Sequence, residues 1–75
     1  MKLLDNKTLH DSIRLRLVEE IKLSGLSQTQ IAQMVNISDA SLSDYIHKGK
    51  LPSLETFALI CNAIGASADE ILGLN

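Results

Sequence analysis

Residues 26–48, LSQTQIAQMVNISDASLSDYIHK, constrain the fold most, because two short amphipathic segments follow each other there with only a few residues between them. Ser27 and Gln30 have the spacing of a capping box, in which each side chain satisfies a free N–H of the first helical turn. The apolar residues that follow share one helical face, at Ile31, Ala32 and Val35. The first segment is therefore predicted to be a helix of about two turns.

The pattern breaks at Asn36-Ile37 and restarts at Ser38. Asparagine tolerates the left-handed conformation that reverses a chain, and Ile37 can fill the corner from inside. Ser38 is a good N-cap, and Asp39 places negative charge where the helix dipole favours it. The second helix has its apolar face at Leu42, Tyr45 and Ile46. Two short helices joined by such a turn form a helix-turn-helix.

The remaining sequence predicts three further helices. Residues 1–7 form a polar lead-in without a strong pattern, and a long helix is predicted from Thr8 to Ser24-Gly25. Its apolar residues recur every four positions, at Leu9, Ile13, Leu17 and Ile21. After Pro52, a helix capped by Ser53 has a predicted core face at Leu54, Phe57, Ile60, Cys61 and Ile64. Ser67 and Glu70 open a last helix with a second capping box, and Ile71 and Leu72 close the core. We therefore expect one all-α domain over residues 1–75.

An ordered set of residues resembles the Xre family of phage-repressor and Cro-like regulators. It begins with Gly25-Leu26-Ser27-Gln28-x-x-Ile31-Ala32-x-x-Val35-x-Ile37-Ser38-x-x-Ser41-Leu42-Ser43. It continues through Pro52-Ser53-Leu54-Glu55-Thr56, Ile60, Ile64-Gly65 and Ser67-x-Asp69-Glu70-Ile71-Leu72-Gly73. The resemblance implies a compact five-helix repressor-like DNA-binding domain, with its helix-turn-helix at the second and third helices. It also implies a sequence-specific transcriptional regulator, a repressor, that reads the major groove of double-stranded DNA with the third helix.

The resemblance also assigns residues to the DNA surface. Gln28 would contact a phosphate or a base from the start of the second helix, and Ser38 and Lys50 would lie on the phosphate side. Lys48 would also belong to the DNA-binding surface. The reading positions would be Asp39, Ala40, Ser41 and Asp44, with Ser43 beside them. Ser41 can bond a phosphate or a base, Ala40 can touch a thymine methyl group, and an aspartate can accept from the cytosine amine.

One position departs from the family pattern. The glycine of the turn after the third helix commonly stands one place earlier, where this chain has Lys48 and follows it with Gly49. Either the third helix runs one residue longer here, or Lys48 itself takes a positive φ. The direction of the Lys48 and Lys50 side chains depends on which alternative holds.

The charge of the chain favours a second class of function. Strong nucleic-acid binders carry a basic footprint, whereas this chain has a net charge of −2. The acids gather toward the C-terminal end, where residues 54–75 hold three acidic groups and no basic one. Asp39 suits a helix N-terminus with or without DNA, but Asp44 is either a specificity residue or a sign of a protein partner. The alternative is therefore a protein–protein interaction module or antitoxin-type partner with the same fold.

Other functions find little support. His10 and His47 are far apart, and the single Cys61 lies in an apolar helical pattern, so neither a metal site nor a cofactor is expected. No arrangement of residues suggests an activated nucleophile, so we expect neither an enzyme nor a small-molecule substrate. No apolar run reaches membrane-spanning length and no signal peptide is evident, which predicts a cytoplasmic protein. One such domain reads few base pairs, so a homodimer is expected, formed through the fifth helix and its tail or through the first helix.

Overall fold

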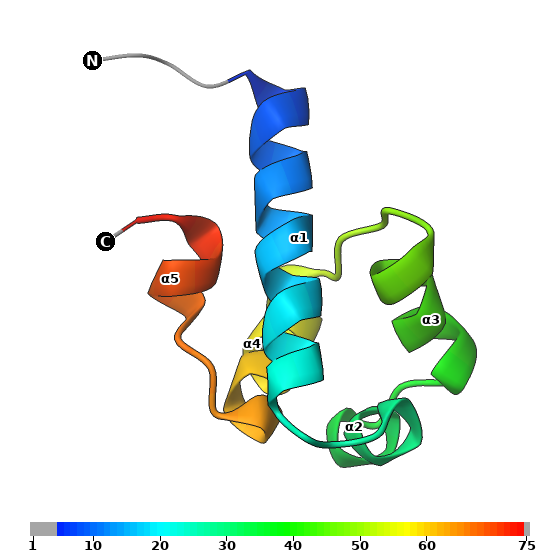
Figure 1. Cartoon of the computed structure of the whole chain (residues 1–75). Helices are drawn as coiled ribbons and strands as arrows, with labels where there is room; N and C mark the ends of the chain where they lie inside the picture. The colour runs from blue at the N-terminus through cyan, green and yellow to red at the C-terminus, as the bar shows by residue number, and fades with distance from the viewer. Residues whose placement is uncertain (1–4, 75) are drawn as a thin grey trace.

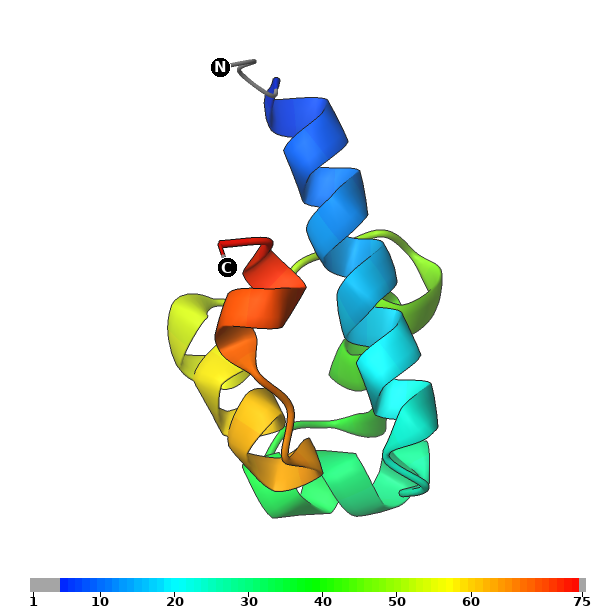
Figure 2. The same cartoon turned by 60° about the vertical axis from the view of Figure 1, so that its left-hand side comes forward.

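The computed structural model describes residues 5–74, whose regular structure is entirely helical. The five helices are α1 (Asn6–Leu23), α2 (Gln28–Val35), α3 (Asp39–His47), α4 (Leu54–Ile64) and α5 (Ala68–Leu72). α1 crosses the molecule with α5 on one side and α3 on the other, and its N-terminal turns extend beyond the other helices (Figure 1, Figure 2). α2 packs against α3 and α4. The expected all-α, five-helix fold is confirmed.

α1 begins two residues before the predicted start at Thr8. Asp5 is its N-cap, and its carboxylate accepts a hydrogen bond from the Thr8 backbone N–H over 2.7 Å. This bond also holds the pKa of Asp5 below its usual value. The predicted lead-in is therefore too long at its C-terminal end, since Asn6 and Lys7 are helical, and its residues 1–4 lie outside the described residues.

Each of the other four helices begins at a serine that accepts a hydrogen bond from the backbone three residues ahead, as the sequence predicts: Ser27, Ser38, Ser53 and Ser67. The predicted capping box at α2 is complete, because the Gln30 N–H donates to Ser27 Oγ (3.1 Å) and the Ser27 N–H donates to Gln30 Oε1 (2.8 Å). At α5 the structure has one bond of the predicted box, from the Glu70 N–H to Ser67 Oγ at 3.4 Å. Such caps contribute about 1 kcal/mol each, which matters in helices this short.

Every helix contributes one large side chain that is almost fully inaccessible: Leu17, Ile31, Leu42, Ile60 and Ile71. Around them lie the other buried residues, Ile21, Ala32, Val35, Phe57 and Cys61. Ile13 and Leu72 pack against this cluster, but Leu9 and Leu15 remain exposed on α1. The predicted apolar stripe of α1 is thus buried only from Ile13 onward.

Leu54 is the clearest error in the predicted core, because 80% of it is exposed. It is the first residue of α4, and it lies beyond the edge of the packed cluster although it shares the helical spacing of Phe57 and Ile60. Leu54 lines a shallow apolar hollow at the surface together with Ile13, Leu51, Pro52, Phe57 and Leu72. The hollow thus combines parts of α1, α4, α5 and the segment before α4.

Cys61 is buried as predicted, and burial raises the pKa of its thiol. Because the folded-state pKa lies above the unfolded one, the resulting stabilisation is complete below about pH 8.5 and is lost as pH rises through the folded pKa. We therefore expect the free energy of unfolding in urea to fall more between about pH 7.5 and pH 10 in the parent than in Cys61→Ala. Equal losses in the two proteins would contradict this role for the thiol.

Candidate nucleic-acid interface

The turn between α2 and α3 has the geometry that its sequence predicts. Asn36 takes a left-handed conformation, with φ 59° and ψ 47°, and ends α2. The Ile37 N–H then donates to the Ala32 carbonyl over 3.0 Å, and the Ile37 side chain packs against the core. Ser38 caps the next helix at once. Two helices are thus joined by three residues into a helix-turn-helix.

α3 has a buried face and a polar face. Leu42 is fully buried, and Tyr45 and Ile46 pack against the core at the same side. Because residues four apart share a helical face, Ala40 and Asp44 lie together on the side opposite Leu42. The predicted reading residues Asp39 and Ala40 are exposed, while Ser41, Ser43 and Asp44 are half-buried.

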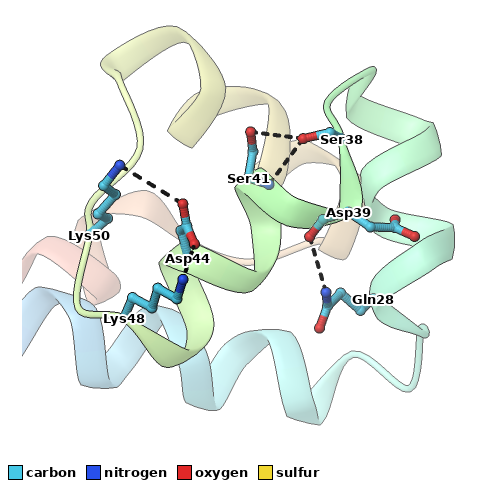
Figure 3. Close-up of polar contacts among 7 residues, drawn as sticks. All are labelled: Gln28, Ser38, Asp39, Ser41, Asp44, Lys48 and Lys50. Atoms are coloured by element: carbon cyan, nitrogen blue, oxygen red, sulfur yellow. Dashed lines mark hydrogen bonds and ion pairs between the residues drawn. The ribbon is translucent and has the colours of Figure 1, made fainter.

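At the start of α3, two side chains from α2 contact Asp39, and Figure 3 shows the contact made by Gln28. The Gln28 amide donates from Nε2 to the Asp39 backbone carbonyl over 3.2 Å, and the Thr29 hydroxyl donates to the Asp39 carboxylate over 3.4 Å. The first turns of the two helices are therefore linked by Gln28, which the sequence analysis assigned to DNA alone. The Thr29 contact was missed, because the angle between two helices cannot be read from their separate patterns.

Ser38 and Ser41 form a second polar contact on this surface. Ser38 Oγ accepts from the Ser41 N–H over 3.0 Å and donates its own proton to Ser41 Oγ, also over 3.0 Å (Figure 3). Since Ser41 Oγ accepts in this pair, its own O–H remains able to donate to another group. The hydroxyl has the polarity needed to approach a phosphate oxygen or a base acceptor. Ser43, by contrast, takes part in no side-chain hydrogen bond among residues 5–74.

At the end of α3, Asp44 is surrounded by positive charge. Its carboxylate oxygens lie 3.7 Å from Lys48 Nζ and 3.8 Å from Lys50 Nζ (Figure 3). Both lysine side chains are largely exposed, at 74% and 70%, and such surface ion pairs contribute no more than about 1 kcal/mol. The lysine ammonium groups are therefore held only weakly, and the charge of Asp44 has partners within the chain.

The turn after α3 resolves the two alternatives for Lys48. Lys48 has a φ of −112°, and Gly49 takes the left-handed conformation, with φ 74°. The alternative in which Lys48 takes a positive φ is therefore wrong. Glycine occupies the one position of this turn that favours it.

α1 supplies two contacts to this turn that the sequence analysis missed. Arg14 donates from Nη2 to the Ile46 carbonyl over 2.8 Å, and His10 donates from Nε2 to the Gly49 carbonyl over 2.7 Å. Their spacing of four residues places both on one face of α1, but only the packing of α1 against α3 gives that face a partner. His10 also borders a polar hollow beside α3 that includes Ser41, Asp44, Tyr45 and Lys50.

No three His, Cys, Asp or Glu side chains within residues 5–74 gather closely enough to hold a metal ion. None of the helices in that range combines the length and apolarity needed to cross a bilayer.

Comparison with known proteins gives one family. The family model HTH_3, described as helix-turn-helix, matches residues 17–71. No curated protein and no solved structure matches the chain. The matched residues contain α2, α3 and α4, nearly all of α5 and the last two turns of α1, whereas residues 5–16 precede the match.

Proposed function

The chain belongs to the helix-turn-helix family of Xre/Cro-like DNA-binding domains, and on that premise we propose that it is a sequence-specific transcriptional repressor. In this proposal α3 enters the major groove and α2 lies across the backbone, as in other helix-turn-helix proteins. The observation that carries the proposal is the outer face of α3, where exposed and half-buried polar residues end in two exposed lysines. Occupying a site in this way would exclude polymerase.

Each residue of this surface has a proposed role in the complex. Ser41 donates to a base or a phosphate, Ala40 contacts a thymine methyl group, and Asp44 accepts from a cytosine amine once its lysines have moved to phosphates. Further contacts are proposed for the N-terminal part of the surface, from Gln28, Ser38, Asp39 and Ser43. Lys48 and Lys50 supply the salt-dependent part of the affinity.

A homodimer is the second part of the proposal. A helix of nine residues reads only a few base pairs, so a two-fold site with half-sites about 34 Å apart would give much greater discrimination. The apolar hollow lined by the exposed Leu54 supports this part, because an isologous interface joins the same surface patch of both subunits and this patch is apolar. The hollow includes Ile13 from α1 and Leu72 from α5, the two helices from which the sequence analysis expected contacts.

Selection of bound sequences from a random duplex pool tests both parts together. We expect an enriched sequence with two-fold symmetry and half-sites about one helical turn apart. Asymmetric enriched sites would contradict the homodimer alone, and failure to enrich any sequence would contradict specific binding.

The lysines give a quantitative prediction. In fluorescence-anisotropy titrations with the selected duplex, replacing Lys48 and Lys50 with alanine should weaken binding and reduce the slope of log affinity against log salt by about 2. Lys22→Ala is the control, since it removes a basic residue from the last turn of α1. An unchanged slope in the double variant would show that these lysines do not contact phosphates.

The rival function is a protein-binding module or antitoxin-type partner, which the net charge of −2 favours. The acidic residues after α3 are Glu55, Asp69 and Glu70. Asp44 no longer favours this rival, because its charge is matched within the chain by Lys48 and Lys50. Absence of binding to random duplex at low salt and tens of micromolar protein would favour the rival.

A further inference from the structure

The first turns of α1 make an unusual set of contacts. Three of their side chains, all within residues 5–16 and thus before the family match, donate to backbone carbonyls elsewhere in the fold. His10 bonds Gly49 at 2.7 Å, Arg14 bonds Ile46 at 2.8 Å and Arg16 bonds Ile71 at 2.6 Å. Ile46 and Ile71 lie in the last turns of α3 and α5, where carbonyls have no partner within the helix and carry partial negative charge, so basic donors suit them.

Two of these three contacts converge on the turn that carries the lysines. Arg14 holds the carbonyl of Ile46 in the last turn of α3, and His10 holds that of Gly49 just beyond it. Lys48 lies between these two points and Lys50 directly follows them. These two hydrogen bonds from α1 therefore hold the backbone of the segment that contains Lys48 and adjoins Lys50. The ammonium groups of both lysines remain exposed.

Gly49 lies where α1 contacts this turn. A Cβ atom there would make an ordinary van der Waals contact with the Arg14 side chain, 3.7 Å from Nε, so it is the left-handed φ, and not a lack of space, that favours glycine. The glycine that departs from the family pattern thus lies at the contact between α1 and the turn.

We infer that His10 and Arg14 are positioning residues for DNA binding, which orient Lys48 and Lys50 toward phosphates without touching DNA themselves. The inference rests on the proposed function, because it assigns a task to the same lysines. Arg16 makes an equivalent bond to the end of α5, away from α3, and has no such task.

Arg14→Ala and Arg16→Ala form a matched pair, because each removes one positive charge and one bond from α1 to a backbone carbonyl. With Kd expressed per folded protein, from circular dichroism, we expect Arg14→Ala to weaken binding to the selected duplex about tenfold and to lower the salt slope by about 1 to 2. We expect Arg16→Ala to stay within about twofold of the parent, since surface charges far from DNA are screened. Equal losses in the two variants would overturn the inference.

His10 provides a second pair that does not change the number of arginines. His10→Gln keeps a side-chain N–H donor and should retain the affinity and the salt slope of the parent. His10→Ala removes the donor and should have a lower affinity and a smaller salt slope. If Arg14→Ala fails to fold, this pair still tests whether a side chain of α1 positions the lysines. Equal behaviour of the two His10 variants would then overturn the inference.

A double-mutant cycle separates positioning from direct contact. In a Lys48→Ala/Lys50→Ala background, Arg14→Ala should cause little further loss, because the groups that it positions are gone. Additive losses would mean that Arg14 acts on DNA by itself and would overturn the inference while leaving the proposed function intact. A parent that binds no duplex would overturn both.

Discussion

Replacing Ser41 with glutamate is expected to abolish specific DNA binding while the protein stays folded. A loss of at least about a hundredfold corresponds to about 2.7 kcal/mol of binding free energy, which one negative charge facing phosphates at close range can supply. The fold should tolerate the change, because residue 41 is the third position of α3 and Ser38 is its N-cap. Ser-x-x-Glu at these positions is itself a capping box.

Ser41→Gln is the control for this prediction. Glutamine has nearly the same shape and also completes a capping box, so the two variants differ mainly in charge. Anisotropy titration with the selected duplex should separate them widely, while thermal unfolding should place both within about 1 kcal/mol of the parent. Equal affinities for the glutamate and glutamine variants would remove α3 from the proposed DNA surface.

The largest expected effect on stability follows from replacing Leu42 with alanine. Leu42 is fully buried and is the one buried residue of α3, so the truncation leaves a cavity where α3 meets the core. Leucine-to-alanine changes at such sites lower the free energy of unfolding by about 2 to 5 kcal/mol. A domain of 75 residues has about 4 to 11 kcal/mol in total, so a large part of its stability should be lost.

Leu15→Ala is the matched control, because it makes the same chemical change at a residue that is 62% exposed. Chemical unfolding in urea at low protein concentration should give this variant a stability within about 0.5 kcal/mol of the parent. A loss below about 1 kcal/mol for Leu42→Ala would mean that the core repacks around α3.

Much of the fold follows from signals within a few residues of each other. Ser27 and Asn36 mark the two ends of α2 and Ser38 marks the start of α3, through bonds that span at most five residues, and the sequence predicts all three. The start of α1 at Asn6 was missed because Asp5, which is also a good cap, lies in a stretch without apolar periodicity. Local capping chemistry is therefore more informative here than hydrophobic spacing.

The contacts between helices could not be predicted in the same way. Leu54 has the spacing of a core residue, yet it is 80% exposed at the first position of α4 and lies outside the packed cluster. The bonds of His10 and Arg14 span 39 and 32 residues, so they depend on how α1 crosses α3. The roles of Gln28 and Asp44 on DNA stay predictions, and both side chains also have partners within the chain.

The five largest fully buried side chains come one from each helix, so no helix has a hydrophobic centre of its own. Unfolding any one helix would therefore expose apolar side chains of the shared core to water. Protection of core amides against hydrogen exchange should accordingly be similar in every helix and track global unfolding. The position of α3 thus depends on packing shared among all five helices. A substitution that destabilises a distant helix should therefore also destabilise the outer face of α3.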